Sequence, residues 1–352
     1  MKFQLCYSQN KFSYFCRVKI EEKYIKRCLQ LAQNGFGTTY PNPLVGSVIV
    51  YNDRIIGEGW HQKSGGPHAE VNAINAVKDP SLLPFSTIYV SLEPCSHFGK
   101  TPPCADLIIA KKIPNVVIGT LDPHAKVAGN GIKKLLENNI NVKIGFLETE
   151  CHELNKRFFT FQQKKRPYII LKWAQTKDGF IAPKSKDINQ PVWISNEYSR
   201  QLVHQWRSEE QAILVGFQTV VDDNPSLTTR DWAGNNPIRV VLDKNNSISK
   251  DFAIFDNQSK TLVFSEPFND NNEIWTNKIA DFLFQNDIQS IIIEGGKTTI
   301  QRFIDANLWD EARVFIGTAV FKEGLSAPLI SNKPFHRTNI LDDELLIYNN
   351  HD

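Results

Sequence analysis

The chain has 352 residues, of which 41% are hydrophobic and 22% charged, the composition of an ordinary globular protein of about two domains. Its 40 basic and 38 acidic residues nearly balance, which argues against a strongly basic nucleic-acid coat and an acidic disordered tail. The longest apolar runs, such as residues 291–293, are far shorter than the roughly 20 residues of a membrane-spanning helix.

The first 20 residues form a distinct segment with four basic residues and no acidic one. Such a composition superficially suggests a targeting peptide, but the apolar run is too broken for a secretory signal and no small-residue cleavage site is evident. We therefore expect residues 1–20 to be a short disordered extension ahead of the first domain.

Hydrophobic periodicity predicts alternating helices and strands between residues 21 and 150. The predicted helices are 21–34, 68–77, a helix starting at 106, and 130–137. The predicted strands are 45–50, 54–59, 87–92, 115–120 and 142–146, with a hairpin turn at Asn52-Asp53. This alternation predicts an α/β layered domain over residues 21–150.

Residues 151–166 are predicted to form a helical linker that ends in a basic cluster, after which the alternation starts again. The predicted strands are 168–173, 212–215, 238–242, 261–264, 290–294 and a final strand at 311–316. The predicted helices are 196–207, 275–285 and 298–307. These elements predict a second α/β domain over residues 167–352, built on a parallel sheet.

Two short segments of the first domain carry a metal-binding pattern. His68 and Glu70 lie in a Pro-His-Ala-Glu segment, and eight residues separate Cys95 from Cys104. One imidazole and two thiolates make three protein ligands, the number typical of a catalytic zinc site that leaves a position for water. Glu70 starts the same predicted helix as His68 and can reach that water without binding the metal. The pattern predicts zinc bound by His68, Cys95 and Cys104, with Glu70 as the catalytic acid–base.

A plainer interpretation of the same residues is a satisfied core histidine and two buried thiols. Their occurrence in the order His, Glu, Cys, Cys on a predicted βαβ frame favours the metal site. Zinc deaminases carry the same His-x-Glu and Pro-Cys pattern, ordinarily with Pro-Cys-x-x-Cys. The four remaining cysteines lack such context and are interpreted as structural or incidental, and six cysteines in all are too few for a disulfide scaffold.

Longer motifs surround these residues. They are TYPNPLVG (39–46), GEGWH (57–61), PHAE (67–70), LEPCSHFGKTPPC (92–104), and DPH (122–124) followed by VAG (127–129). With them, the chain resembles the bifunctional riboflavin-biosynthesis deaminase/reductase family over nearly its whole length. The cysteine spacing within this resemblance differs from that of cytidine and tRNA-adenosine deaminases.

The resemblance implies two consecutive reactions. The N-terminal domain would use zinc to deaminate 2,5-diamino-6-(5-phosphoribosylamino)pyrimidin-4-one hydrolytically, and the C-terminal domain would use NADPH to reduce the ribosyl group of the product to ribityl. The residues implied to surround the pyrimidine or its phosphoribosyl group are Asn42, His61, His97, Lys100, Thr101 and His124. Lys100 suits a phosphate, although a solvated loop lysine is the plainer alternative, and His124 stands where many members have Asn.

The reductase half carries a weaker pattern of its own. Residues 294–298, EGGKT, follow a predicted buried strand and open a predicted helix, where backbone N–H groups can approach a phosphate. This is not the G-x-G-x-x-G fingerprint, and a Gly-Gly turn alone is more often only a tight turn. The segments VVDDNPSLTTR (220–230), LKWA (171–174) and DG (178–179) resemble the dihydrofolate-reductase-like domain of the same family.

By this resemblance, the residues that bind NADPH are Ala174, Trp193, Thr219, Asp223, Lys244, Gly296, Lys297, Thr298, Thr299, Ile300, Gln301 and Arg302. The residues that contact the substrate are Lys172, Pro191, Arg207, Leu227, Arg230 and Glu294. Two arginines suit the ribosyl phosphate because a guanidinium binds phosphate bidentately. Pro191 replaces a common Ser and Lys244 a small residue, which leaves an active deaminase with an impaired reductase as an alternative.

We therefore expect an α/β protein in which a cytidine-deaminase-like three-layer domain precedes a dihydrofolate-reductase-like α/β domain. The expected cofactors are one Zn²⁺ per deaminase domain and NADPH. The expected partners are small-molecule phosphoribosylaminopyrimidines and further copies of the chain in a cytoplasmic dimer or tetramer, without nucleic acid or membrane. A nucleic-acid deaminase would need a basic face and Pro-Cys-x-x-Cys, and a zinc-stabilised scaffold would have no use for Glu70.

Overall fold

The computed structural model describes residues 11–96, 102–123, 129–185, 192–266 and 271–350, with side chains from residue 21 onward. The chain divides into two compact units, residues 1–159 and 160–352. The division falls within the segment 151–166 that the sequence analysis assigns to a linker. In the described residues, no helix has both the length and the apolar character needed to cross a membrane.

The first unit is built on a five-stranded sheet with the strand order β2-β1-β3-β4-β5. The strands are β1 (Gly46–Tyr51), β2 (Arg54–Trp60), β3 (Thr87–Leu92), β4 (Asn115–Thr120) and β5 (Asn141–Ile144). β1 pairs antiparallel with β2 and β3, whereas β3, β4 and β5 are parallel. Asn52 and Asp53 both have positive φ (47° and 57°), as the tight turn of the predicted β1–β2 hairpin requires.

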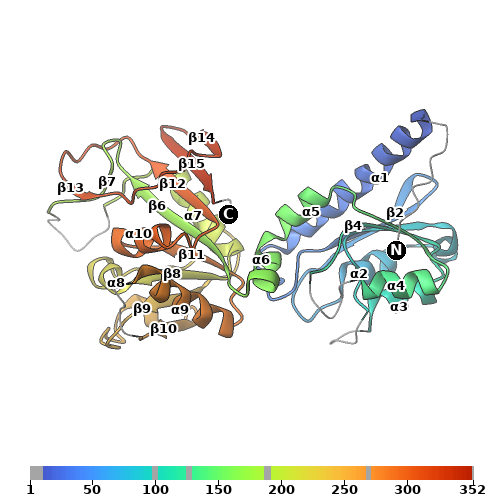
Figure 1. Ribbon diagram of the computed structural model, residues 1–352, viewed down its shortest axis with the longest axis horizontal. Coiled ribbons are helices and arrows are strands. Elements are labelled where there is room, and N and C mark those ends of the chain that lie inside the picture. Colours follow the sequence, from blue (N-terminus) through green and yellow to red (C-terminus); the bar gives the residue numbers. More distant parts are fainter. Residues whose placement is uncertain (1–10, 97–101, 124–128, 186–191, 267–270, 351–352) are drawn as a thin grey trace. The chain divides into compact units, whose positions relative to one another are not determined.

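Helices cover both faces of this sheet, which makes the unit three-layered (Figure 1). They are α1 (Lys11–Ala32), α2 (Ala69–Asn75), α3 (Cys104–Ala110), α4 (Asn130–Glu137), α5 (Glu148–Leu154) and α6 (Lys156–Lys164), the last of which spans the division between the units. The unit also has two 3-10 helices, η1 (Gln33–Gly35) and η2 (Pro80–Phe85). α1 packs through Tyr24, Ile25 and Cys28 on one face, and α2, α3 and α4 pack on the other around Ile88 and Ile118.

α1 is longer than the sequence analysis predicted. It begins at Lys11, so the expectation of disorder is wrong for residues 11–20. Those ten residues contain neither Pro nor Gly, and nothing in them interrupts the helix that the amphipathic segment 21–32 establishes. Residues 1–10 lie outside the described part of the chain.

The second unit is built on an eight-stranded sheet with the order β10-β9-β8-β11-β6-β12-β15-β14. The strands are β6 (Tyr168–Gln175), β8 (Ala212–Gly216), β9 (Ile238–Leu242), β10 (Thr261–Phe264), β11 (Ser290–Glu294), β12 (Glu311–Ile316), β14 (His336–Ile340) and β15 (Asp343–Asn349). β7 (Phe180–Pro183) and β13 (Gly324–Ser326) form a separate two-stranded ribbon.

Two predictions for this sheet are wrong. β12 is not the final strand, and the sheet is not wholly parallel, because β14 and β15 add an antiparallel hairpin to its edge. The parallel part of the sheet consists of six neighbouring strands, in the order β10, β9, β8, β11, β6 and β12. β14 is an edge strand with mostly exposed residues, and such a strand carries no hydrophobic pattern for sequence analysis to detect.

Helices cover both faces of the second sheet as well (Figure 1). They are α7 (Glu197–Glu209), α8 (Phe217–Asp223), the short 3-10 helix η3 (Ala253–Phe255), α9 (Asn272–Gln285) and α10 (Lys297–Asp305). α9 and α10 bury Trp275, Ile279 and Phe303 on one face, and α7 buries Val203 and Trp206 on the other. The side chains of Asn196 and Asn271 cap α7 and α9 by accepting hydrogen bonds from backbone amides.

Candidate active sites

The residues predicted to bind zinc come from three elements of the first unit. His68 is the residue before α2, Cys95 lies three residues beyond the end of β3, and Cys104 is the first residue of α3. The amide of Cys104 donates to the Sγ of Cys95 (3.3 Å) and that of Ala105 to the carbonyl of Cys95 (3.1 Å). The start of α3 is thereby tied to the turn that carries Cys95.

The distances among these side chains match a tetrahedral zinc site. The Nδ1 of His68 lies 3.5 Å from the Sγ of Cys95 and 3.4 Å from that of Cys104, and all three ligand atoms lie within 4.8 Å of one another. Zn–S bonds of about 2.3 Å and Zn–N bonds of about 2.0 Å, set at tetrahedral angles, place N and S roughly 3.5 Å apart. The three side chains therefore fit zinc.

The surroundings of Cys95 favour its thiolate form. Hydrogen bonds from the Cys104 side chain and from His68 lower the pKa of Cys95 to about 4, although its burial opposes the shift. The thiolate is the form of cysteine that binds a metal.

Glu70 lies in the first turn of α2 and is 3% exposed. Burial, together with the negative charge of Cys95, raises its pKa to about 7, against the opposing effect of His68. A carboxyl group with a pKa near neutrality can both accept and deliver a proton. Glu70 therefore lies in the first turn of the helix that follows His68, with a raised pKa that suits the predicted acid–base role.

His61 and Asn42 form a hydrogen-bonded pair next to His68. The ring of His61 meets that of His68 edge to face, with centroids 5.5 Å apart. Its Nδ1 lies 3.0 Å from the carbonyl oxygen of Pro67 and its Nε2 lies 2.9 Å from the Nδ2 of Asn42. Because a carbonyl can only accept, Nδ1 carries the proton and Nε2 accepts from Asn42. Burial lowers the pKa of His61, which favours this neutral form of the ring. Because the Nδ2 of Asn42 donates to the ring, the Oδ1 of Asn42 points away from it.

Four of the predicted substrate residues of this unit, His97, Lys100, Thr101 and His124, lie outside the described residues. Sequence reasoning assigned no role to Glu93, whose buried carboxylate accepts hydrogen bonds from backbone amides around the start of α4. The sequence offered one clue to this residue: Glu93 lies two residues before the predicted zinc ligand Cys95.

In the second unit, the predicted substrate residues Lys172, Arg207 and Glu294 form one buried cluster. The guanidinium of Arg207 binds the Glu294 carboxylate through Nη2 (2.9 Å) and Nε (3.4 Å), and the Nζ of Lys172 lies 3.8 Å from the same carboxylate. Burial alone would raise the pKa of Glu294, but the charges of Arg207 and Lys172 outweigh it and lower the pKa to about 2. Burial lowers the pKa of Lys172, although Glu294 opposes the shift.

Arg230 and Leu227 lie in the loop after α8. The amide of Arg230 donates to the Nδ1 of His204 on α7 (3.2 Å), and its Nη1 donates to the Oγ of Ser226 (2.7 Å). Leu227 is buried with a positive φ of 54°. Pro191 lies outside the described residues.

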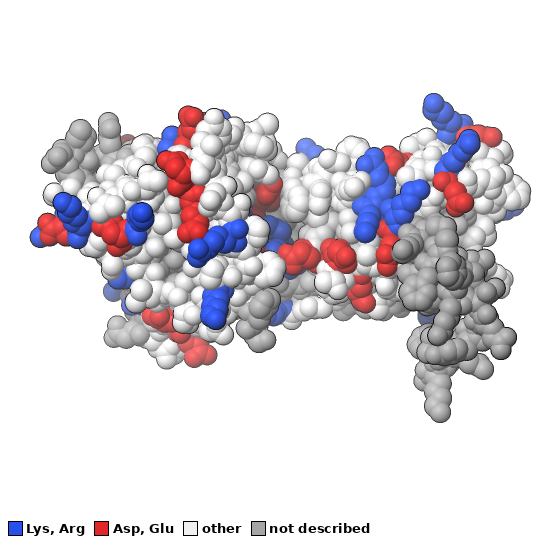
Figure 2. All heavy atoms as spheres, turned by 90° about the horizontal axis from the view of Figure 1, so that it is seen from above, with Lys and Arg blue, Asp and Glu red and all other residues white. Residues whose placement is uncertain are grey.

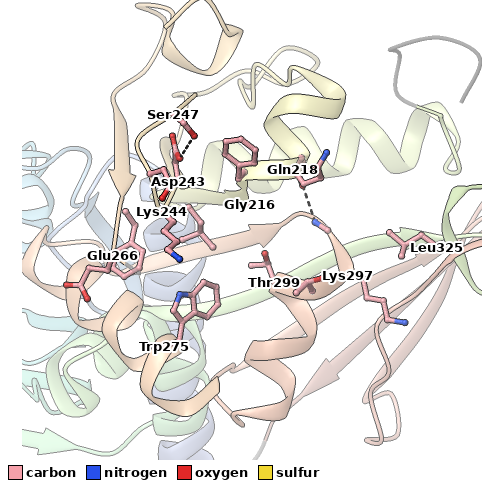
Figure 3. A pocket seen from close by; sticks show the side chains of 17 residues that line it. Gly216, Gln218, Asp243, Lys244, Ser247, Glu266, Trp275, Lys297, Thr299 and Leu325 are labelled. Carbon is pink, nitrogen blue, oxygen red and sulfur yellow. Dashed lines mark hydrogen bonds between the residues drawn. The ribbon is translucent and has the colours of Figure 1, made fainter. Parts of the chain in front are cut away.

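A cavity of about 440 Å³ opens beyond the ends of β8, β9, β10 and β11 (Figure 3). The predicted cofactor residues that line it are Thr219, Lys244, Gly296, Lys297, Thr298 and Thr299. The Oγ1 of Thr219 accepts from the amide of Gly296 (3.1 Å), which joins the β8–α8 turn to the β11–α10 turn. A Cβ on Gly216 would lie 3.0 Å from the Oγ1 of Thr299. Two strand-to-helix turns thus meet closely at the carboxyl edge of a parallel sheet, where open α/β folds bind their ligands.

The other predicted cofactor residues do not line this cavity. Ile300 is fully buried in the core, Gln301 bonds to Asp305 and Leu329, and the Arg302 guanidinium lies over the ring of Trp275. Ala174 is on β6, Asp223 ends α8, and Trp193 is 60% exposed beneath the guanidinium of Arg200.

Several cavity residues had no place in the sequence analysis. The apolar part of the cavity wall is formed by Trp275, Phe264 and Leu242. Polar groups are added to the wall by Asp243, Asn245 and Glu266. In Figure 3, Lys244 and Trp275 point toward the same space. The available signal was the position of residues 243–247 and 265–266 directly after two predicted strands, since the carboxyl ends of parallel strands share one edge.

On the face of the molecule shown in Figure 2, acidic and basic side chains of the described residues are interspersed among uncharged ones. On this face, the described side chains therefore differ from the concentrated basic surface that nucleic-acid binding uses.

Comparison with known families identifies both units. Residues 18–120 match the family model of the cytidine and deoxycytidylate deaminase zinc-binding region, and residues 167–344 match the RibD C-terminal domain. The fold and the two sites thus define a zinc-binding deaminase joined to a reductase.

Whole-length relatives give the particular family. The riboflavin biosynthesis protein RibD of Aquifex aeolicus is 38% identical over 324 residues, which cover 88% of this chain and 90% of that protein. RibD of Escherichia coli is 35% identical over 84% of this chain and 87% of its own. The crystal structure of a diaminohydroxyphosphoribosylaminopyrimidine deaminase/5-amino-6-(5-phosphoribosylamino)uracil reductase from Thermotoga maritima is 37% identical, with a TM-score of 0.85 over 95% of this chain and all of that one.

The chain belongs to the RibD family of riboflavin biosynthesis proteins. It is a bifunctional deaminase/reductase with a zinc-binding deaminase domain and a reductase domain of the NADPH-using kind. The expected family, fold class and cofactors are thereby confirmed.

Proposed function

We propose that the first unit converts 2,5-diamino-6-(5-phosphoribosylamino)pyrimidin-4-one and water into 5-amino-6-(5-phosphoribosylamino)uracil and ammonia. We propose that the second unit then reduces the ribosyl group of this product to ribityl with NADPH. The observation that carries the proposal is the similarity over 95% of the chain to the Thermotoga maritima enzyme, whose name states both activities. The compatible geometry of His68, Cys95 and Cys104 supports the first reaction.

In the first reaction, His68, Cys95 and Cys104 would hold zinc, which would supply a water activated near neutral pH. The Glu70 carboxylate takes a proton from this water and delivers it toward the leaving amino group, which departs as ammonia. Burial raises the pKa of the Glu70 carboxyl above that of an exposed glutamate, which suits a group that alternately accepts and delivers a proton. His61 fixes the side-chain amide of Asn42, whose Oδ1 can then accept a hydrogen bond from the pyrimidine. His97, Lys100, Thr101 and His124 complete this proposed site.

In the second reaction, NADPH would supply a hydride to C1 of the opened ribose and solvent the accompanying proton, so the protein would mainly position the two partners. We assign the cofactor to the cavity between the β8–α8 and β11–α10 turns, where backbone amides at the start of α10 suit a phosphate. Lys244 lines the same cavity and can pair with the 2′-phosphate that distinguishes NADPH. Ala174, Trp193, Asp223 and residues 300–302 remain proposed cofactor residues on the resemblance alone.

The buried cluster of the second unit supports the substrate assignment. Glu294 holds Arg207 and Lys172 in place, and Lys172 is the cation proposed at the reacting end of the ribose. Arg207 and Arg230 are proposed to bind the ribosyl phosphate. Leu227 and Pro191 complete the proposed contacts.

We also propose that the protein works in the cytoplasm as a homo-oligomer, a dimer or a tetramer. The four cysteines whose side chains are described form no disulfide, which suits a reducing compartment. The exposed edge strand β14 offers backbone groups that a second copy could pair with. Light scattering on the purified full-length chain would give the oligomeric state, and a monomer at all concentrations would contradict this part.

The test of the proposed function is ammonia release from the diaminopyrimidinone ribotide without NADPH, measured for the wild type and Glu70→Gln side by side. We expect release by the wild type only, with zinc bound to both proteins. Adding NADPH to the wild-type reaction should then give NADPH oxidation. No release by zinc-loaded wild type would contradict the substrate, and equal release by the variant would contradict the role of Glu70. Release without NADPH oxidation would favour the impaired reductase.

A further inference from the structure

Glu93 stands out among the buried charged residues of the first unit because its carboxylate is surrounded by backbone amides. It directly follows β3 and is 4% exposed. Its Oε2 accepts from the amides of Gly129 (3.0 Å) and Asp122 (3.4 Å). Its Oε1 accepts from those of Gly131 (3.1 Å) and Ile132 (3.4 Å). Burying a carboxylate costs free energy unless it is hydrogen-bonded. The four hydrogen bonds therefore hold the Glu93 side chain against Asp122 and against residues 129–132.

These bonds give α4 a cap that its own sequence lacks. The residue before α4 is Gly129, which has no side chain to cap the helix and has a φ of 81°. Glu93 supplies the negative charge and the acceptors that the first amides of a helix favour. Glu93 caps this helix although it precedes Gly131 by 38 positions in the sequence.

The same segment packs directly on the chain beside Cys95. A Cβ on Gly131 would lie 2.1 Å from the carbonyl oxygen of Pro94, so only glycine permits this approach. β3 and β4 are parallel neighbours, with Leu92 opposite Thr120. The segments that follow them therefore emerge at the same edge of the sheet, where α/β folds place their ligand sites.

The zinc ligands have anchors that do not involve the Glu93 side chain. Cys95 is held by the amides of Cys104 and Ala105, and His68 accepts at its carbonyl from the amide of Asn72 on α2. Residues 122 and 129–132, by contrast, are hydrogen-bonded to the Glu93 side chain, which adds to the direct approach of Gly131 to Pro94.

We propose that Glu93 is a positioning residue of the deaminase: it fixes residues 121–123 and 129–132 against the turn before Cys95, and so shapes the wall against which the pyrimidine substrate binds. This inference rests on the proposed deamination. The carboxylate acts on substrate binding rather than on zinc binding or on the proton transfer by Glu70.

The test compares wild type, Glu93→Gln and Glu93→Asp as full-length, zinc-loaded proteins. Gln keeps the size but replaces one acceptor oxygen with an amide that faces backbone donors, whereas Asp keeps the charge on a shorter side chain. We expect Glu93→Gln to raise the KM for the ribotide in ammonia release by about tenfold or more, with a smaller fall in kcat. Glu93→Asp should recover part of the loss.

Two further readouts separate positioning from general damage. Zinc content and NADPH oxidation on the deaminated substrate should match the wild type. Backbone amide exchange should accelerate at residues 122 and 129–132 in particular. Asp79→Asn is the matched control, because it makes the same carboxylate-to-amide change at an exposed cap of the same unit, where Asp79 accepts from the amide of Ser81. We expect this control to behave as wild type.

An unchanged KM in zinc-loaded Glu93→Gln would overturn the proposal, as would loss of zinc from that variant, since either result would separate Glu93 from substrate binding. If Glu93→Gln does not fold, Glu93→Asp decides in the same way: a raised KM with zinc retained supports the proposal, and a wild-type KM overturns it. Failure of the wild type to release ammonia would instead refute the proposed function.

Discussion

Replacing Glu294 by Gln tests whether the buried charge cluster of the second unit is held by one carboxylate. The change leaves Arg207 and Lys172 side by side without their shared anion, at positions where both side chains are no more than 15% exposed. Removing one partner of a buried ion pair typically costs about 3–5 kcal/mol.

The pKa of Glu294 gives a second measure of the same interaction. Its value of about 2 in the folded protein, against 4.5 for an unperturbed glutamate, corresponds to roughly 3 kcal/mol by linkage. Because the folded pKa is depressed, this stabilisation is fully present above pH 4.5 and is lost as the pH falls toward 2. The two measures agree in size, so we expect Glu294→Gln to lower the free energy of unfolding of the second unit by about 3 kcal/mol at pH 7.

Urea unfolding followed by tryptophan fluorescence is the suitable assay, because six of the seven tryptophans lie in the second unit and only Trp60 lies in the first. The difference between wild type and Glu294→Gln should shrink as the pH is lowered from 5 toward 2. Glu344→Gln is the control, since Glu344 pairs at 3.1 Å with a largely exposed Arg337 and such pairs contribute less than about 1 kcal/mol. A loss below about 1 kcal/mol at pH 7 for Glu294→Gln would refute the reasoning.

Three further predictions concern the two sites. A strong zinc chelator should abolish ammonia release while NADPH oxidation on the deaminated substrate continues, and loss of both would contradict separate sites. Trp275→Phe should raise the KM for NADPH without affecting ammonia release, because Trp275 lines the proposed cofactor cavity; an unchanged KM would move the cofactor elsewhere. Gly131→Ala should impair ammonia release but not NADPH oxidation, because the added Cβ meets the carbonyl of Pro94. Lys133→Ala, at an exposed position of α4, is its control, and wild-type ammonia release by Gly131→Ala would contradict the close approach.

The chemistry of the deaminase site was predictable because its information is local. His68 and Glu70 are two residues apart, and Cys95 and Cys104 bracket one loop, so residue type and spacing already indicate zinc and a proton-transfer group. Buried parallel strands were equally accessible, since each is a short continuous apolar run. β3, β4, β9, β10 and β11 have the bounds that periodicity predicts.

Features that depend on contacts between distant segments required the tertiary structure. In the edge hairpin, β14 is mostly exposed and has no hydrophobic signature. Its place in the sheet depends on its pairing with β15, which in turn pairs with β12. Trp275 has the sequence pattern of a core residue, and it reaches the cavity because α9 packs beside the β11–α10 turn.

Glu93 illustrates most clearly which features the sequence reveals and which require the tertiary structure. Its position before Pro94-Cys95 is evident in the sequence, but its function as the cap of α4 depends on hydrogen bonds to amides 29 to 39 residues away. The sequence by itself determined which chemical groups the protein carries and which short segments form strands and helices, because those properties depend on neighbouring residues. Only the tertiary structure decided which backbone donors and side chains meet, because folding brings together atoms whose separation along the chain carries no pattern.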